Sequence, residues 1–273
     1  MGYRRILTIQ DISCVGQCSM TVALPILSAC GHEVCILPSA VLSTHTGGFG
    51  KPAVQKLTDL MKETVAHWKE NQITFDLIYV GYLGSLEAVR ITEEIMDTML
   101  APGGITVVDP AMADHGKRYS GLSEEYASAM TALCAKADVM IPNMSEAAMM
   151  TGTEFRDDFD EAYVRLLLEK LSGNNVLLTG VGFAPDQTGF AVREKNLIGY
   201  FTHERLEKNY SGTGDIFAAA FCGALSCGKD MRVAGEIAAK FTLRCIQSTA
   251  EAPAHWYGVK FETALPYLMT LVE

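Results

Sequence analysis

Short apolar runs alternate with longer segments of helical periodicity along most of this chain. The short runs predict strands, because a strand buried on both faces is a nearly continuous apolar segment. The predicted strands cover residues 4–10, 33–37, 40–42, 75–80, 105–108, 138–141 and 175–178. The longer segments predict helices over residues 18–30, 52–70, 86–100, 143–151 and 159–171, with a further helix that ends near Lys136.

The last third of the chain has a different pattern. Residues 187–193 and 197–202 predict a hairpin around Glu194, Lys195 and Asn196, and helices then run to the end. Breaks in these helices are expected near Gly228 and between Glu251 and Val259. Two polar, Gly-rich stretches, 43–50 and 114–121, predict loops.

This alternation predicts an α/β fold with three layers, α/β/α. Strands that alternate with helices form a mostly parallel central sheet covered on both faces. The hairpin adds antiparallel edge strands. The chain has no internal repeat, low-complexity segment or long linker, so we expect a single domain over residues 1–273.

Composition narrows the function classes. The chain has 273 residues, of which 49% are hydrophobic, so it can build a large core. A net charge of −10 argues against a nucleic-acid surface. No apolar run is long enough for a membrane span, and the N-terminus does not resemble a signal peptide. The eight cysteines form no C-x-x-C pair, which predicts reduced thiols in a cytoplasmic protein and disfavours a zinc site.

Polar or Gly-containing turns follow nearly every predicted strand. Asp11, Tyr82, Asp109, Asn143 and Thr179 all stand at such positions. Ligands of open parallel sheets bind outside the carboxyl ends of the strands. These turns therefore predict one binding cleft, without naming a reaction.

The stretch from Asn209 to Gly228 contains the most specific chemistry. Gly212, Thr213 and Gly214 form a turn, and Asp215 follows at the start of an apolar helix. The first amides of such a helix favour an anion, and a carboxylate beside them can accept a proton. This combination suits phosphoryl transfer. The alternative is that Thr213 is an ordinary N-cap and Asp215 an ordinary first-turn charge.

Seven stretches in the same order resemble the pyridoxal kinase family of the ribokinase-like superfamily. They are ILTIQD, LSTHTG, VGYLGS, VVDPAMAD, IPNMSEA, LLTG and SGTGDIFAA, and they span almost the whole chain. The resemblance implies a ribokinase-like fold and an ATP-dependent kinase of pyridoxal, pyridoxamine or pyridoxine. It also implies a homodimer and a Mg²⁺ cofactor, and it leaves a K⁺ requirement open.

The resemblance also implies roles for particular residues. Asp215 matches the catalytic base, and Gly212, Thr213 and Gly214 match the anion hole. The implied nucleotide and metal residues are Asp109, Asp114, Asn143, Glu146 and Thr179. Of these, Asp109 and Glu146 would serve Mg²⁺, Glu146 through water. The implied substrate-binding residues are Asp11, His45, Thr46 and Tyr82.

Three positions depart from the family pattern. Asp11 stands where a serine is usual, Leu42 where an aromatic residue is common, and Ile141 where a threonine is frequent. A carboxylate at Asp11 accepts hydrogen bonds when ionised, whereas serine can donate or accept. The departures concern the substrate more than the phosphoryl chemistry.

Other interpretations remain open from the sequence. Asn143 and Glu146 also form a good capping box. The acceptor could be hydroxymethylpyrimidine or another small alcohol. A nucleotide-binding oxidoreductase is disfavoured, because the first turn, DISCVGQCS, lacks the expected Gly-rich pattern. A vitamin-binding protein without activity is disfavoured by Asp215.

Overall fold

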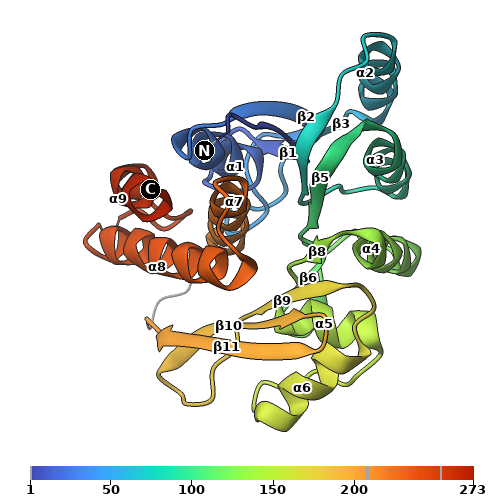
Figure 1. Cartoon of the computed structure of the whole chain (residues 1–273). Coiled ribbons are helices and arrows are strands. Elements are labelled where there is room, and N and C mark those ends of the chain that lie inside the picture. Colours follow the sequence, from blue (N-terminus) through green and yellow to red (C-terminus); the bar gives the residue numbers. More distant parts are fainter. Residues whose placement is uncertain (1, 207–209, 253) are drawn as a thin grey trace. The chain divides into compact units, whose positions relative to one another are not determined.

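The computed structural model describes residues 2–206, 210–252 and 254–273 (Figure 1). Asn209, the first residue of the predicted Gly-rich stretch, lies outside the described residues. Contacts within the chain define two compact units. The first comprises Met1–Gly104 and Glu207–Glu273, and the second comprises Ile105–Leu206. The expectation of a single domain stays a prediction.

Four strands lie wholly within the first unit, in the order β3-β2-β1-β4. They are β1 (Arg5–Ser13), β2 (Glu33–Leu42), β3 (Val54–Lys56) and β4 (Phe75–Val80). β1 is parallel to both β2 and β4, while β3 is antiparallel to β2. Ile6, Leu7 and Ile9 of β1 are fully buried. This explains the continuous apolar run, because a strand covered on both faces has no polar side.

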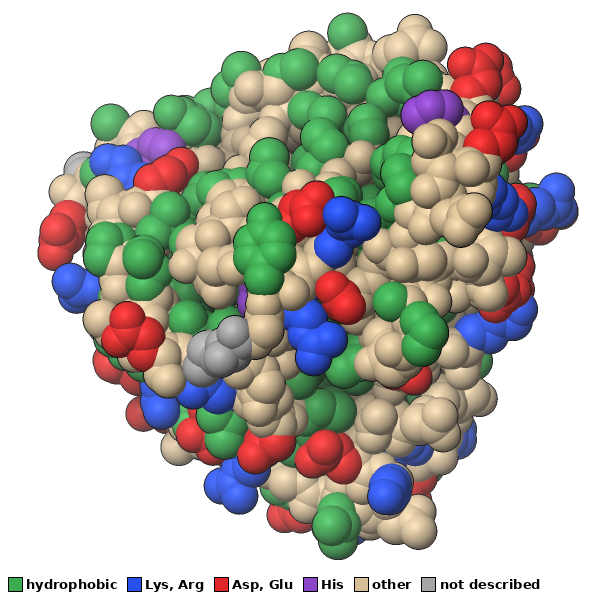
Figure 2. Space-filling view, turned by 45° about the horizontal axis from the view of Figure 1, so that its top comes forward, with side chains coloured by type: hydrophobic (Ala, Val, Ile, Leu, Met, Phe, Trp, Pro, Cys, Tyr) green, Lys and Arg blue, Asp and Glu red, His purple; other side chains and the backbone are tan. Residues whose placement is uncertain are grey.

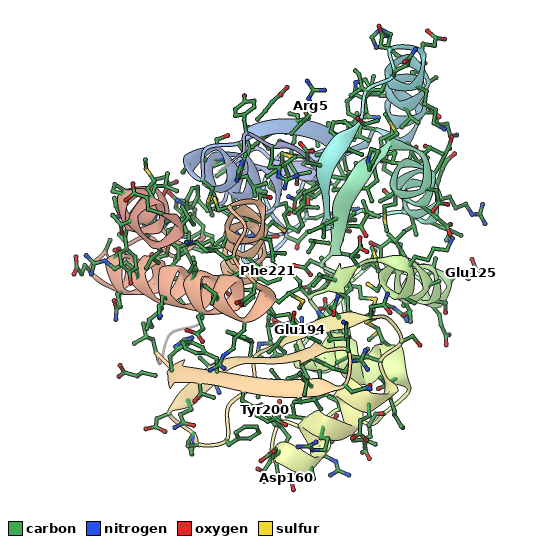
Figure 3. The ribbon with its side chains drawn as sticks, in the orientation of Figure 1. Arg5, Glu125, Asp160, Glu194, Tyr200 and Phe221 are labelled. Atoms are coloured by element: carbon green, nitrogen blue, oxygen red, sulfur yellow. The ribbon has the colours of Figure 1, made fainter. Side chains whose placement is uncertain are left out.

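Helices cover both faces of these strands (Figure 1). The helical elements of the first unit are α1 (Met20–Ala29), α2 (Thr58–Glu70), α3 (Leu86–Met99), α7 (Thr213–Ser226), α8 (Met231–Ala250), η1 (Glu262–Ala264) and α9 (Leu265–Val272). α1 packs against β1 and α7, and α7 packs against α8. Phe221 of α7, labelled in Figure 3, is fully buried. The apolar character of α7 follows from this burial.

The second unit holds a mixed set of strands. β5 (Leu100–Val108) begins in the first unit and ends in the second, and its last residues pair in parallel with β8 (Val139–Met140). β8 pairs in parallel with β9 (Asn175–Thr179). β10 (Gln187–Glu194) and β11 (Leu197–Glu204) continue antiparallel from β9, so the predicted hairpin is confirmed.

Short elements and three helices complete the second unit. They are β6 (Ala113–Asp114), β7 (Lys117–Arg118), α4 (Glu124–Lys136), α5 (Met144–Thr151) and α6 (Glu161–Lys170). α5 packs against β9 and α6, and α4 packs against β8. Asp160, labelled in Figure 3, caps α6 by accepting from the Tyr163 N–H at 2.9 Å.

Several predicted boundaries were wrong. Residues 52–57 are not helical. β3 occupies 54–56 because its backbone pairs with Ala40–Leu42 of β2, and α2 begins only at Thr58. The predicted loop 114–121 contains β7 and the end of β6. The strands 33–37 and 40–42 are one strand, β2, because its pairing with β1 passes through Pro38 and resumes after a shift of register, with Gln10 opposite Pro38 and Ile12 opposite Val41.

Two surface observations complete the description. In the part of the chain that the structure describes, no helix is long and apolar enough to cross a membrane. On the face shown in Figure 2, Lys and Arg side chains are interspersed with Asp and Glu side chains.

Candidate functional site

The turn at Gly212 is shaped by backbone geometry that only glycine tolerates. Gly212 is the N-cap of α7, with φ 84°. A Cβ built there would lie 2.0 Å from the Gln17 carbonyl oxygen. Both the left-handed φ and this close approach exclude a side chain. The segment after β1 and the turn before α7 are therefore in direct contact.

The first turn of α7 presents uncapped amides. Among the described residues, no side chain caps this helix, since the Thr213 hydroxyl donates to the Tyr210 carbonyl at 3.4 Å instead. The interpretation of Thr213 as an ordinary N-cap is wrong, because Gly212 holds that position. A Cβ on Gly214 would meet no heavy atom within 4 Å, so the space beside it is open. The first amides of a helix without a side-chain cap can bind an anion.

Asp215 is in the same first turn, and its side chain remains partly accessible. Burial raises the pKa of Asp215 to about 7, while the Ser19 backbone N–H lowers it and the Asp11 charge raises it. A carboxylate with this pKa is ionised in an appreciable fraction near neutral pH and is basic enough to accept a proton.

Asp11 is part of β1, which extends to Ser13, beyond the predicted end at residue 10. Its side chain is only 3% exposed and accepts a hydrogen bond from the Ser13 hydroxyl at 3.1 Å. Burial raises the pKa of Asp11, while the hydroxyls of Ser19 and Ser13 lower it. Asp11 is therefore a buried carboxylate held by hydroxyl groups.

His45 lies in the 43–50 loop with both ring nitrogens occupied. Nδ1 accepts from the Gly47 N–H at 2.9 Å, and Nε2 donates to the Tyr257 carbonyl at 2.7 Å. This pair of contacts fixes the neutral tautomer with its proton on Nε2. His45 is buried and lies edge-on to Phe49, with ring centroids 5.0 Å apart. The ring thus holds the loop and has no free nitrogen for a ligand.

The other two predicted substrate residues are accessible. Thr46 is exposed in the same loop. Tyr82 is partly buried after β4, and both burial and the nearby Asp11 charge raise its pKa. Tyr82 follows β4, the strand that pairs with β1, whereas for Thr46 the structure shows only its place in the loop.

Asn143 and Glu146 form a complete capping box at the start of α5. The Asn143 amide oxygen accepts from the Glu146 N–H at 2.9 Å, and Glu146 Oε2 accepts from the Asn143 N–H at 2.9 Å. Glu146 Oε1 accepts from the N–H groups of Met112 and Ala113, at 2.9 and 3.3 Å. Asn143 Nδ2 also donates to the Ala113 carbonyl at 2.8 Å. These two side chains therefore fasten the 112–113 backbone to α5.

Glu146 is almost completely buried, at 2% exposure. Burial raises its pKa to about 7, the backbone N–H groups of Asn143, Met112 and Ala113 lower it, and the Asp114 charge raises it. Its two oxygens are already committed to three backbone donors. A direct bond to a metal would have to displace some of them.

The remaining predicted nucleotide residues lie at strand ends of the second unit. Asp109 is partly exposed after β5 and accepts from the Ala111 N–H at 3.1 Å. Asp114 is exposed and accepts from the His115 N–H at 2.8 Å. Thr179 ends β9, and its N–H donates to the Pro142 carbonyl at 2.9 Å. Asn143 and Thr179 form an isolated parallel β-bridge, so these two residues are neighbours.

The segment 13–19 contains functional candidates that the sequence analysis missed. Ser19, Cys18 and Ser13 all interact with Asp11 or Asp215. Ser19 has φ 51° and ψ −129°, an unusual conformation for a residue other than glycine. The small and polar residues that follow β1 were the available signal for this segment.

Leu42 and Ile141, two of the positions that depart from the family pattern, are both buried, at 6% and 3% exposure.

An open hollow in the second unit is lined by Arg156, Asp158, Phe159, Asp160, Glu161 and Phe183. None of the predicted site residues lines it, so its position does not support a part in the predicted chemistry.

Comparison with known proteins identifies the family. The model of the phosphomethylpyrimidine kinase family matches residues 41–259. The chain belongs to this family. It is 32% identical to a pyridoxal kinase from Lactobacillus plantarum of known structure, with a TM-score of 0.90 over 99% of this chain and 98% of that one. The mixed α/β fold and the resemblance to pyridoxal kinases are confirmed.

Two further relatives bear on the kinase family's range. A phosphomethylpyrimidine kinase homologue from Bacteroides thetaiotaomicron, solved with pyridoxal, has 32% identity and a TM-score of 0.89 over 98% of this chain and 96% of that one. The pyridoxine/pyridoxal/pyridoxamine kinase of Bordetella avium is 26% identical over 89% of this chain and 85% of its own length. The kinase family is thus represented by enzymes named for two kinds of acceptor.

Proposed function

We propose that this protein is an ATP-dependent kinase that phosphorylates the 5′-hydroxymethyl group of pyridoxal, pyridoxamine or pyridoxine. The observation that carries the proposal is the start of α7, which has no side-chain cap among the described residues and has open space at the Cβ position of Gly214, next to Asp215. Membership of the kinase family and the similarity to pyridoxal kinases support the choice of acceptor. A structure of the Leishmania donovani pyridoxal kinase contains ADP and pyridoxamine, which supports ATP as the donor class in such relatives.

In this proposal Asp215 accepts the proton of the acceptor hydroxyl while the hydroxyl oxygen bonds to phosphorus. The amides of the Gly212, Thr213 and Gly214 turn stabilise the negative charge on the transferring phosphoryl group. A base in this position typically contributes about 10²–10⁴-fold to the rate. Thr46 and Tyr82 contact the acceptor ring, and Asp11 is the buried polar group at that end of β1. His45 holds the loop that carries Thr46.

The proposed nucleotide residues are Asp114, Asn143, Glu146 and Thr179. Asp109 and Asp114 suit Mg²⁺, because they are accessible carboxylates and Mg²⁺ prefers oxygen ligands, waters and substrate phosphates. Glu146 does not suit direct ligation, since both its oxygens accept backbone N–H groups. Glu146 would act on Mg²⁺ indirectly, either by holding the backbone of Met112 and Ala113, which follows Asp109, or through a water molecule. When bound with ATP, Mg²⁺ would neutralise phosphate charge.

Assembly and location form part of the same proposal. The family resemblance supports a homodimer. The buried thiols of Cys30, Cys134 and Cys245 accord with a reducing, cytoplasmic environment. Light scattering of the purified protein would test whether it is a homodimer. A K⁺ titration of activity would decide whether the proposed reaction needs a monovalent cation.

A second candidate acceptor is hydroxymethylpyrimidine. The name of the matching family supports it, as does 27% identity to the hydroxymethylpyrimidine/phosphomethylpyrimidine kinase of Haemophilus influenzae over 61% of this chain. The deciding experiment measures ATP consumption with the three B6 vitamers, hydroxymethylpyrimidine and simple sugars. We expect the highest kcat/KM with a B6 vitamer. Turnover of hydroxymethylpyrimidine alone would replace the proposed acceptor, and turnover of none of them would remove the proposed function.

A further inference from the structure

Gln17 lies in the segment that follows β1 and contacts two other parts of the first unit. Its carbonyl oxygen packs against the turn before α7, where a Cβ on Gly212 would lie only 2.0 Å from it. Its side-chain Nε2 donates to both carboxylate oxygens of Glu262, at 2.8 and 3.0 Å. Its Oε1 accepts from His255 Nε2 at 2.6 Å. Gln17 therefore joins the start of α7 to the part of the chain that lies between α8 and α9.

The partners of the Gln17 amide fix its orientation. An ionised carboxylate only accepts hydrogen bonds, so the amide nitrogen faces Glu262 and the amide oxygen faces His255. That oxygen also only accepts, so the His255 proton lies on Nε2. Gly258 packs against the same side chain, since a Cβ there would lie 2.8 Å from Gln17 Oε1. The Gln17 side chain is thus held at three points around residues 255–258, which we call the connecting segment.

The connecting segment in turn holds the 43–50 loop. The Tyr257 carbonyl accepts from His45 Nε2 at 2.7 Å. The rings of Trp256 and Phe49 pack together, with their centroids 4.7 Å apart, and the Phe49 and Tyr257 rings are 5.9 Å apart. One hydrogen bond and two aromatic contacts therefore fix the loop to a segment that is more than 200 residues away in the chain.

The 43–50 loop also lies beside the turn before α7. A Cβ on Gly47 would lie 3.0 Å from the hydroxyl oxygen of Ser211, the residue before Gly212. The His45 N–H donates to the Val15 carbonyl at 3.1 Å, in the same segment as Gln17. The segment after β1 therefore touches the loop through its backbone, and through the Gln17 side chain it holds the connecting segment that fixes the loop's aromatic residues.

We propose that Gln17 is a positioning residue that fixes the 43–50 loop relative to the Gly212 turn, by holding the connecting segment. This inference rests on the proposed function, in which Thr46 of the loop contacts the acceptor and the turn binds the transferring phosphoryl group. Reacting atoms must approach to about 3–3.5 Å, so the loop and the turn have to be placed accurately with respect to each other. The Gln17 backbone contacts the turn and its side chain serves the loop, so mutation can separate the two contributions.

The first test is a comparison of two Michaelis constants in Gln17→Ala, which removes the side-chain hydrogen bonds and keeps the carbonyl beside Gly212. We expect KM for the best acceptor of the panel to rise about three- to tenfold, the effect of losing one or two hydrogen bonds, with KM for ATP unchanged. A general loss of stability would not separate the two constants. His255→Phe keeps a ring at this position but lacks the N–H donor, and it should show the same separation. Gln55→Ala is the matched control, because Gln55 donates to the Lys56 carbonyl in β3, and both constants should stay unchanged.

The second test follows the connecting segment without an activity assay. The chain has two tryptophans, Trp68 and Trp256, so Trp68→Phe leaves Trp256 as the only one. In this background, Gln17→Ala and His255→Phe should each increase the fast component of the Trp256 fluorescence anisotropy decay, because the segment is held less tightly. Gln55→Ala should leave the decay unchanged.

The two tests together support or overturn the inference. Equal rises in both KM values, or an unchanged KM for the acceptor, in correctly folded Gln17→Ala would overturn it, and so would an unchanged anisotropy decay. If Gln17→Ala does not fold, His255→Phe decides by the same criteria. If the wild-type protein phosphorylates no acceptor of the panel, the proposed function fails, and the anisotropy decay still decides whether Gln17 holds the connecting segment.

Discussion

Asp215 in the first unit and Glu146 in the second are two carboxylates that both have a raised pKa but differ in how many backbone N–H groups they accept from. Burial raises the pKa of each to about 7. Glu146 accepts hydrogen bonds from three backbone N–H groups and is 2% exposed. Asp215 has one backbone donor, from Ser19, and remains partly accessible beside an open turn.

This difference separates a structural carboxylate from one available for chemistry. A carboxylate whose oxygens are committed to backbone donors stabilises those segments and has little remaining capacity for a ligand. A carboxylate with few partners retains lone pairs that can accept a proton from a substrate. A raised pKa alone would not have distinguished the two residues, because its main physical cause, burial, is the same in both.

The largest expected effect comes from Asp215→Asn. The substitution removes the proposed base but keeps the size of the side chain, so kcat should fall by about two to four orders of magnitude. ATP affinity and folding should change little. Steady-state kinetics with a nucleotide-binding titration on the same preparation measures this.

The matched control for Asp215→Asn is Asp230→Asn. Asp230 also begins a helix, where it accepts from the Val233 N–H at 2.8 Å, and asparagine caps helices equally well. We expect near-wild-type kcat in this control. Comparable activity in the two variants would end the assignment of Asp215 as the base.

The next effect is expected at the glycine turn. Gly212→Ala places a Cβ against the Gln17 carbonyl and requires a left-handed φ, so it should lower the free energy of unfolding by about 1–3 kcal/mol or more and reduce activity. Gly214→Ala meets open space and should leave stability unchanged or slightly improved, since alanine favours helices. Urea denaturation of both variants measures the contrast, and equal loss of stability would contradict it.

Glu146→Gln should mainly affect stability. The Gln amide nitrogen is a donor and cannot accept from backbone N–H groups, so at least one buried donor is left without its partner. We expect a loss of about 1–3 kcal/mol in the free energy of unfolding. Asp160→Asn is the control in the same unit, because asparagine can still accept from the Tyr163 N–H.

Activity of Glu146→Gln then sharpens the comparison. If Glu146 acts on the metal indirectly, the Mg²⁺ requirement should also move to higher concentration, whereas a capping residue alone would change only the denaturation midpoint. Loss of kcat as large as that of Asp215→Asn, with unchanged stability, would contradict the structural assignment of Glu146.

The smallest expected effect is a pH dependence of stability from Glu146. Its pKa is raised from 4.5 to about 7, so the folded state binds more protons than the unfolded state between these values. Its contribution to stability therefore falls as pH rises through this window and is constant above it. Urea denaturation across the window should show a shallower decline in Glu146→Gln than in the wild type, and an equal decline would show that other groups cause it.

Much of the fold followed from local patterns in the sequence. The apolar run at the start of β1 and the alternation of strands and helices depend on residues close together in the chain, and both are found in the structure. The Gly212 turn was also identifiable, because glycine marks a left-handed conformation wherever it must occur. Family membership, which the ordered motifs indicated, is likewise a property of the sequence alone.

Only the tertiary structure decided how the candidate residues are used. The capping box of Asn143 and Glu146 was predicted from the sequence and is present in the structure. The hydrogen bonds from Met112 and Ala113 to Glu146 were not predicted, because they join segments more than thirty residues apart. Residues 54–56 form β3 because their backbone pairs antiparallel with the end of β2. Nothing in the sequence of these three residues predicts this pairing. The unusual backbone of Ser19, with φ 51° and ψ −129°, was likewise not evident from the sequence. Local preferences are encoded by neighbouring residues, whereas partners, burial and pKa values arise when distant segments pack together.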